Sequence, residues 1–282
     1  RIAGASGFWG DSAVAVPGMP SATAADSGRE AAVRHELVFV DTGVNDYRKL
    51  VDDLIANAGA DRQFGVVLLD PDANGIEQVA QALAAQSQQV DAVHFITHGT
   101  DGAVKLGNVW LNDQNLDAYA ASIASWQQGL AANADLLLYG CDVADNADGR
   151  ALVDALHALT GANVAASVDV TGNAAFGGNW NLEYSVGTVA TTALFSASAD
   201  EAWSGVLATL TVSTTNDVLD GNTASIAALL ANKGADGQIS LREAIIAANN
   251  TAGADQIILA AGTYQLTIAG TYGALGDLMA EV

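Results

Sequence analysis

Two short apolar runs in the sequence end in residues that can carry out thiol chemistry. The run "HFIT" is followed by His98 and Gly99, and the run "LLLYG" is followed by Cys141, the chain's only cysteine. A thiol attacks carbonyl carbon as its thiolate, and a neighbouring imidazole can take the proton or pair with the charge. Glycine after the histidine lets the backbone come close to a substrate carbonyl. These residue types predict Cys141 as a nucleophile, His98 as its base, and the amides of Gly99 and Cys141 as oxyanion donors.

The elements around these residues must bring them to one place. Apolar runs alternate with segments of helical periodicity, which predicts an α/β fold with a mainly parallel sheet and helices on both faces. Strands are expected at 35–42, 64–71, 90–99, 134–143 and 163–168, and helices at 44–59, 74–86, within 112–129 and at 151–161. Functional groups in such sheets gather at the carboxyl ends of the strands. If the two runs are neighbouring strands, their ends lie about 4.8 Å apart and the side chains can meet.

Helix starts give two further expectations. Asn74 is a plausible N-cap with Glu77 three residues on, which is the spacing of a capping box. The helix after Cys141 is expected to begin near Asn146, and its positive end would favour a thiolate.

No acid that would orient His98 is evident, and a backbone carbonyl could hold the imidazole instead. Taken singly, a cysteine at a strand end is usually a small buried hydrophobe, and a histidine in a strand is usually a hydrogen-bonded core residue.

Composition excludes several classes of partner. Asp and Glu number 32 against 10 Lys and Arg, a net charge of −22, which disfavours nucleic acid and anionic membranes. No apolar run approaches the roughly 18 residues that span a bilayer, so no membrane insertion is expected. The sequence begins with Arg and ends without a closing element, and we interpret it as an excerpt from a longer chain. Neither G-x-G-x-x-G after the first strand nor G-x-x-x-x-G-K-[ST] occurs, so nucleotide binding is not expected.

The motifs carry a resemblance. "FITHG" followed by "LLLYGCDVA" resembles the active-site strands of caspase-like cysteine peptidases, a group that includes gingipains, separase and the CHAT peptidases. Over about 35–205, "YGCDVA", "GRALVDALHALTGANVAAS" and "GGNWNLE" resemble a domain of unknown function found near the start of very large bacterial surface and RTX-type adhesins. The resemblance implies a caspase-like fold, His98 as general base, Cys141 as nucleophile and Gly99 with Cys141 as oxyanion donors.

A substrate pocket would be built from loops on the same edge of the sheet. Asp101, Asp142 and Asp169 fall in those loops and make the rim acidic. We therefore expect a preference for Lys or Arg before the cleaved bond, although aspartates at such places can also simply cap turns.

Metal signals are weak. "DPDANG" at 70–75 matches the first half of a calcium loop, but the twelfth position is Gln81, which lacks the bidentate carboxylate. A strand end followed by a helix cap explains the same letters. No cofactor is required by the chemistry predicted above, and the half-matched loop leaves calcium as an optional addition.

The chain divides into three parts. Residues 1–34 are rich in Ala, Ser and Gly and are interpreted as a linker or arm, and 35–205 form the α/β domain. In 206–282, "ADGQISLREAIIAANN" and "ADQIILAAGTYQLTI" resemble the SLREA-type opening of bacterial right-handed parallel β-helices. This implies an incomplete solenoid with a cap helix and first rung, in which Arg242 and Glu243 make structural contacts.

Two functions from different classes remain open. The first is a caspase-like cysteine endopeptidase within an extracellular or cell-surface bacterial adhesin, acting on a protein or peptide or on its own chain. The second is a catalytically silent α/β module for docking or display. The first requires Cys141 close to His98 and reactive, whereas the second allows a buried thiol.

Overall fold

The structure is a computed structural model that describes residues 33–56, 59–100, 102–195, 203, 205–251 and 256–268. Nearly all of the arm expected at 1–34 therefore lies outside the described residues, and the first strand begins at Arg34. The described residues all belong to one compact unit.

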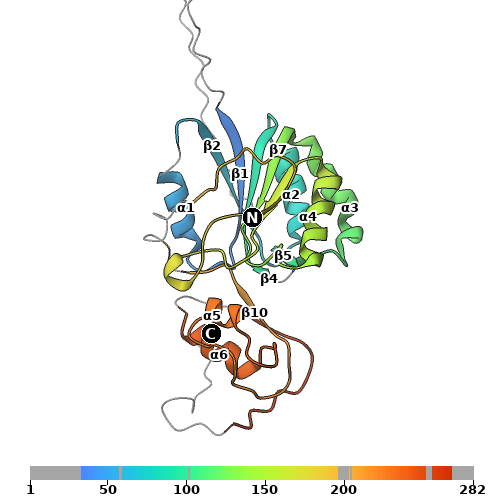
Figure 1. Cartoon of the computed structure of the whole chain (residues 1–282). Helices are drawn as coiled ribbons and strands as arrows, with labels where there is room; N and C mark the ends of the chain where they lie inside the picture. Colours follow the sequence, from blue (N-terminus) through green and yellow to red (C-terminus); the bar gives the residue numbers. More distant parts are fainter. Residues whose placement is uncertain are drawn as a thin grey trace, which may run out of the picture. The chain divides into compact units, whose positions relative to one another are not determined.

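The main sheet has the strand order β2-β1-β3-β7-β8-β9 (Figure 1). Neighbours from β2 to β8 run parallel, which confirms the mainly parallel sheet, and β9 is an antiparallel edge strand. Long apolar runs form the inner strands because both faces of the sheet are covered. The strands are β1 (Arg34–Asp41), β2 (Arg62–Leu69), β3 (Val90–Ile96), β7 (Leu130–Leu138), β8 (Asn163–Ala166) and β9 (Tyr184–Val186).

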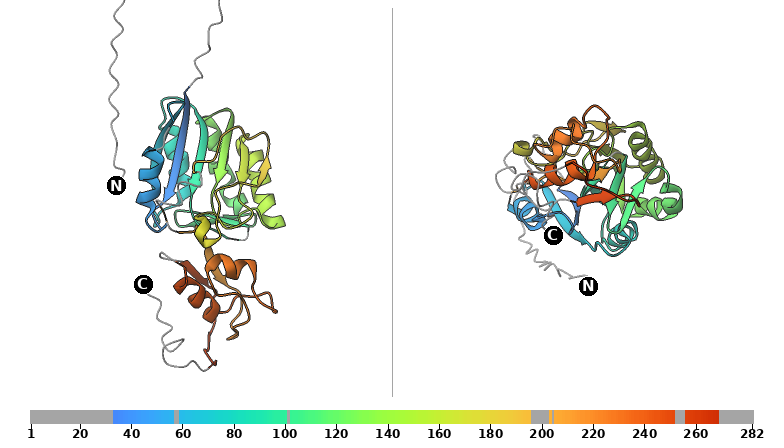
Figure 2. Two further views of the ribbon diagram at one scale, coloured as in Figure 1. Left: turned by 60° about the vertical axis from the view of Figure 1, so that its left-hand side comes forward. Right: turned by 90° about the horizontal axis from the view of Figure 1, so that it is seen from below.

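Three helices cover one face of this sheet, and one lies against the other face (Figures 1 and 2). Helices α2 (Gly75–Ala84), α3 (Leu116–Ser125) and α4 (Ala147–Thr160) bury their apolar stripes in one cluster, whereas α1 (Tyr47–Ala56) buries Leu50 and Leu54 in the opposite one. A short 3-10 helix, Trp126–Gln128, extends α3 and places Trp126 in the first cluster. The expected helices are therefore present, with ends shifted by a few residues.

The helix caps were only partly predicted. Asn74 accepts hydrogen bonds from the amides of Ile76 and Glu77, as expected of an N-cap. The reciprocal half of a capping box is not there, because the Glu77 carboxylate accepts the hydroxyl of Ser122 on α3 instead. Asn146 caps α4 through the amide of Gly149, at the expected position.

Most of the second face is covered by irregular chain instead of helices. Trp180 packs against Phe195 and Trp203, with ring centroids 4.5 and 5.8 Å apart, and all three belong to the cluster that contains α1. A short 3-10 helix, Ala174–Phe176, precedes this segment. Large aromatic side chains bury enough area to close the face without regular structure.

A second, three-stranded sheet follows β3. Strands β4 (Gly99–Thr100), β5 (Ala103–Leu106) and β6 (Val109–Asn112) pair antiparallel in sequence order. The β5–β6 pair is a hairpin within the stretch "AVKLGNVWL". This sheet starts immediately after His98, so it continues the backbone at the carboxyl end of β3.

The described residues of the C-terminal part form two short helices and one parallel strand pair. Strand β10 (Thr209–Val212) pairs with β11 (Gln256–Leu259), and α5 (Ile226–Ala231) packs with α6 (Leu241–Asn249). Ser240 and Glu243 form a complete capping box at the start of α6. Arg242 is buried and donates two hydrogen bonds to Asp217, which also accepts the amide of Ile268. The contacts of Arg242 and Glu243 in the described residues are thus structural ones.

A buried ionic network ties β1 to β2 and β3. Glu36 on β1 accepts Arg62 at 2.6 Å and Arg34 at 3.1 Å, and it lies 2.8 Å from His94 Nε2. Burial on its own raises the pKa of Glu36, but the hydrogen bonds and charges of His94 and Arg62 outweigh it and lower the pKa to about 2. Burial lowers the pKa of His94. His94 is therefore part of a structural network, as expected of a histidine in the middle of a strand.

Candidate functional site

The carboxyl edge of the sheet brings three chemically distinctive residues together. The chain runs from β1 to β2 and then crosses back over β1 to β3, so the carboxyl ends of β1, β3 and β7 lie side by side, where functional groups gather in such sheets. Asp41 closes β1, His98 follows β3, and Cys141 follows β7. Strands β3 and β7 are direct neighbours, so both residues come from adjacent strand ends.

The His98 and Cys141 side chains leave the sheet on the same face. Alternation along β3 puts His98 with His94 and Ile96, and alternation along β7 puts Cys141 with Tyr139. The rings of His94 and Tyr139 are stacked, with centroids 6.0 Å apart, and Ile96, Tyr139 and Cys141 share one apolar cluster. Both side chains are buried, since His98 is 4% exposed and Cys141 is 0% exposed.

The two strand ends pack backbone against backbone. A Cβ placed on Gly99 would lie 2.5 Å from the Cys141 carbonyl oxygen and 2.7 Å from the Cys141 nitrogen. A Cβ on Gly140 would lie 2.9 Å from the α-carbon of Gly99. Only glycine fits at these positions, and the two glycines are what allow the amides of Gly99 and Cys141 to be close neighbours.

Residues 205–208, which we call the covering segment, lie across this edge. Leu207 donates its amide to the Thr171 carbonyl at 2.9 Å, and its own carbonyl oxygen accepts the amide of Gly99 at 3.2 Å. Val206 bridges antiparallel to Gly172, and Ala208 bridges in parallel to Gly99. The covering segment therefore acts as a strand between the 171–173 loop and the start of β4.

His98 is held between two backbone carbonyls. Its Nδ1 lies 3.3 Å from the Leu207 oxygen and its Nε2 lies 3.4 Å from the Gly43 oxygen. A neutral imidazole can donate to only one of them, whereas an imidazolium can donate to both. The Gly43 carbonyl thus occupies the orienting position for which no acid was evident in the sequence.

Asp41 is a residue of this site that the sequence analysis missed. Burial is the main influence on His98 and lowers its pKa, the Asp41 charge raises it, and Lys105 lowers it. Asp41 is buried, lies 3.2 Å from the Lys105 ammonium, and accepts the amide of Gly43 at 2.8 Å. It therefore also shapes the turn that presents the Gly43 carbonyl. The available signal was its place at the end of the first strand, on the same edge as His98.

The expectation that Cys141 is a thiolate is wrong for this conformation. Burial raises the pKa of the Cys141 thiol well above its ordinary value, and the charge of Asp142 raises it further. Hydrogen bonds with the backbones of Thr171 and Leu207 offset only part of this. The Thr171 amide lies 3.1 Å from the sulfur. The positive end of α4 does not overcome burial, and the thiol is neutral beneath the covering segment.

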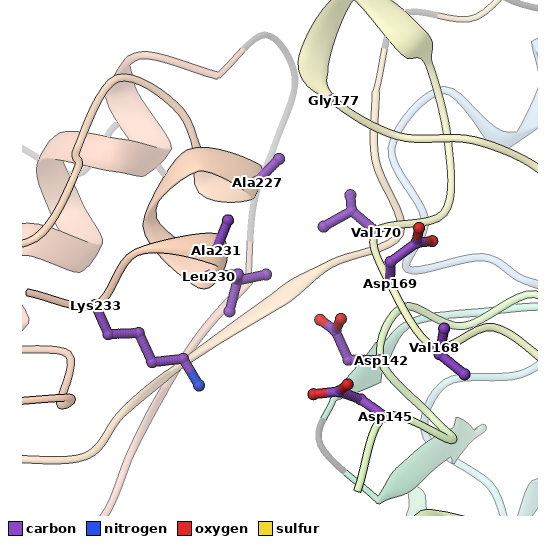
Figure 3. A pocket seen from close by; sticks show the side chains of 10 residues that line it. All are labelled: Asp142, Asp145, Val168, Asp169, Val170, Gly177, Ala227, Leu230, Ala231 and Lys233. Carbon is purple, nitrogen blue, oxygen red and sulfur yellow. The ribbon is translucent and has the colours of Figure 1, made fainter.

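The predicted acidic rim is present in part. Asp142 and Asp169 line a cavity of about 280 Å³ together with Asp145, and Lys233 approaches from the α5 side (Figure 3). Asp101 lies outside the described residues. The Asp142 amide donates to the Asp169 carbonyl, which holds the two loops together. This cavity is lined by neither His98 nor Cys141.

A comparison with protein-family models identifies this α/β part. Residues 37–207 match the model of a domain of unknown function, DUF4347. The chain belongs to the DUF4347 family. No curated protein and no solved structure matches it significantly. The match to DUF4347 ends at Leu207, so most of the covering segment belongs to the DUF4347 domain and Ala208 begins the part beyond it.

The 70–75 segment of the DUF4347 domain forms a turn and a helix cap. Asp70 Oδ1 accepts the Asp72 amide, and the Asn74 side chain caps α2. Within the described ranges, no three His, Cys, Asp or Glu side chains cluster as they would to hold a metal ion. In the same part of the chain, no helix is long and apolar enough to cross a membrane.

Two substitutions at the edge of the DUF4347 sheet should move the His98 pKa in opposite directions. Asp41→Asn removes the charge that raises this pKa, so the pKa is expected to fall. Lys105→Met removes the charge that lowers it, so the pKa is expected to rise. NMR titration of the imidazole, with His98→Ala to assign its signal, measures both shifts. Shifts of the same sign in both variants would refute the electrostatic assignment.

Proposed function

We propose that the DUF4347 domain of this chain is a latent caspase-like cysteine endopeptidase module of a large bacterial surface or secreted adhesin. Cys141 would be the nucleophile, His98 the general base, and the amide of Gly99 an oxyanion donor, with the Cys141 amide beside it. The observation that supports this proposal best is the placement of a peptide carbonyl. The Leu207 oxygen accepts the Gly99 amide at 3.2 Å and faces His98 Nδ1 at 3.3 Å.

The arrangement suits acyl transfer to a thiol. A tetrahedral intermediate carries negative charge on the former carbonyl oxygen, where the Gly99 amide already points. Once His98 has taken the thiol proton, its Nδ1 and Nε2 are both donors, so it can stabilise that charge and keep its bond to Gly43. No metal or organic cofactor is needed for these steps.

The adhesin context is supported by features outside the site. A net charge of −22 suits an extracellular protein better than one that binds anionic surfaces. The parallel β10–β11 pair and the capped helix α6 are the pieces that a β-helix would need for its cap and first rung. We accordingly propose that residues 206–282 begin a right-handed parallel β-helix.

A second candidate is the silent docking or display module. It is favoured by the buried, uncharged state of Cys141. The two candidates differ in whether His98 activates the thiol once the covering segment is loosened.

Alkylation of Cys141 distinguishes them. The unchanged chain should react slowly with iodoacetamide at neutral pH, because the sulfur has no exposed surface. Leu207→Gly removes the buried side chain of the covering segment and should speed the reaction. If the site is catalytic, adding His98→Ala to Leu207→Gly should slow alkylation by about tenfold or more, because the thiolate is lost. The matched change His35→Ala, at the opposite edge of the sheet, should have no effect. Equal rates with and without His98 would favour the silent module.

A further inference from the structure

We propose that the peptide bond between Leu207 and Ala208 is the bond this site cleaves, so that the covering segment is the substrate of its own domain. The inference rests on the proposed function and goes further, because it names the substrate, the bond and the class of residue before it.

The covering segment is bound as a substrate strand would be. Thr171 accepts the Leu207 amide at 2.9 Å, Asn173 donates its amide to the Gly205 carbonyl at 2.9 Å, and Val206 pairs antiparallel with Gly172 between them. Addition of a strand to an existing edge is a general way for proteins to hold an extended peptide, and it fixes which carbonyl lies where. Here the register places Leu207 at the end of the ladder, next to the catalytic candidates.

The carbonyl of Leu207 is the one that reaches the reactive groups. Its oxygen contacts Gly99 and His98. The Cys141 sulfur is hydrogen-bonded to the backbone of Thr171, the residue whose carbonyl accepts the Leu207 amide. Gly205 bonds instead to Asn173. The base and the oxyanion donor therefore converge on the Leu207 carbonyl from the end of β3 and the start of β4. Cys141 lies at the end of the neighbouring strand β7, bonded to the residue that pairs with Leu207.

The Leu207 side chain, which precedes the Leu207–Ala208 bond, indicates that the site accepts an apolar residue at this position. Leu207 is 0% exposed and belongs to the apolar cluster on the α1 face of the sheet. The acidic residues Asp142 and Asp169 line a different cavity, opposite Lys233. A preference for Lys or Arg, which the acidic rim suggested, does not fit this placement, and we infer a preference for leucine or a similar residue.

The chemistry balances with water as the one co-reactant. His98 takes the thiol proton of Cys141 as the sulfur bonds to the Leu207 carbonyl carbon, and the carbonyl electron pair moves to the oxygen held by Gly99. The oxygen lone pair then re-forms the double bond, the carbon–nitrogen bond breaks, and the proton from His98 goes to the Ala208 nitrogen. Water hydrolyses the resulting thioester, which releases the Leu207 carboxylate and restores the thiol.

Burial of the thiol is compatible with a reaction inside the chain. A substrate from solution must first displace the covering segment, whereas the Leu207–Ala208 bond is already held at the site. Intramolecular placement of this kind supplies much of the activation entropy that a bimolecular reaction lacks. The products would be residues 1–207 and 208–282, and the cut would fall just before β10.

The test is the intact mass of the full chain over time, measured under denaturing conditions so that paired fragments separate. The expected result is conversion to the masses of 1–207 and 208–282, with a new amino terminus at Ala208. Cys141→Ala should slow this on the order of 100-fold or more. Leu207→Met should keep the cut, and Leu207→Asp should lose it, with the exposed Leu219→Asp as the matched control.

A parallel assay with fluorescent casein separates this inference from the proposed function. Casein hydrolysis that depends on Cys141, in a chain that stays intact or is cut elsewhere, overturns the inference and leaves the endopeptidase. A cut at Ala208 that persists in Cys141→Ala also overturns it. Absence of both activities overturns the endopeptidase and the inference together.

Discussion

A Gly99→Ala chain is expected to lose roughly 1–3 kcal/mol of folding free energy, or more, because the new methyl group meets backbone and not a movable side chain. The nearest atoms are the Cys141 carbonyl oxygen at 2.5 Å, the Gly140 carbonyl carbon at 2.6 Å and the Cys141 nitrogen at 2.7 Å. The ends of β3 and β7 must separate to admit it. Urea unfolding followed by tryptophan fluorescence measures the loss, and cleavage at Leu207 should disappear with it.

Gly59→Ala is the matched control for this prediction. A Cβ there would also meet an atom at 2.5 Å, but that atom is the tip of the Asp61 side chain, which is exposed and can rotate away. The free energy of unfolding of the Gly59→Ala chain should differ from that of the unchanged chain by about 0.5 kcal/mol or less. Equal losses in the two variants would mean that the contact between the strand ends is not the cause.

Glu36→Gln is expected to cost about 3 kcal/mol of folding free energy. The pKa of Glu36 is lowered from 4.5 to about 2, and 1.36 kcal/mol per unit gives that figure. Removing the charge leaves Arg62 and Arg34 without their shared carboxylate on β1, and a broken buried pair costs a similar amount. Glu77→Gln, on the exposed surface of α2, should change stability by about 0.5 kcal/mol or less. Thermal or urea unfolding at pH 7 measures both variants.

The pH dependence of the Glu36 effect has a fixed sign. A carboxylate whose pKa is lowered by folding stabilises the protein above its unfolded pKa, and this stabilisation is lost as the pH falls through the folded pKa. The difference in stability between the unchanged chain and Glu36→Gln should therefore be full above pH 4.5 and shrink as the pH falls toward 2. A difference that stays constant down to pH 2 would contradict the assigned role of the charge.

The sequence predicted the elements well where one periodicity dominates. The apolar runs of β1, β3 and β7 and the caps Asn74 and Asn146 placed strands and helix starts correctly, because local hydrogen bonds and burial act together there. The covering of the second sheet face was not predictable in the same way. Trp180, Phe195 and Trp203 are scattered along irregular chain, and only tertiary packing brings them together.

The sequence predicted which strand ends supply the site but not the protonation state of the Cys141 thiol. Two glycine-flanked strand ends indicated that His98 and Cys141 share an edge, and the sheet order has their strands adjacent. The residues that control them are nonlocal. Gly43 and Asp41 come from the end of β1. The covering segment "GVLA" has no sequence feature that would predict its position over the site. The neutral thiol follows from that position, so it could not be read from the sequence.

The covering segment is also the only covalent path from residues before 205 to residues after 208. A pulling force applied between those two portions of the chain is carried by the bonds of Gly205 to Asn173, of Leu207 to Thr171 and of Leu207 to Gly99 before it reaches the sheet. These few hydrogen bonds would break before those of the ladder between β3 and β7, because each of them carries a larger share of the force. Mechanical stretching would then pull the covering segment away from the Cys141 sulfur and expose the sulfur to solvent. Tension along the polypeptide would therefore control access to the thiol.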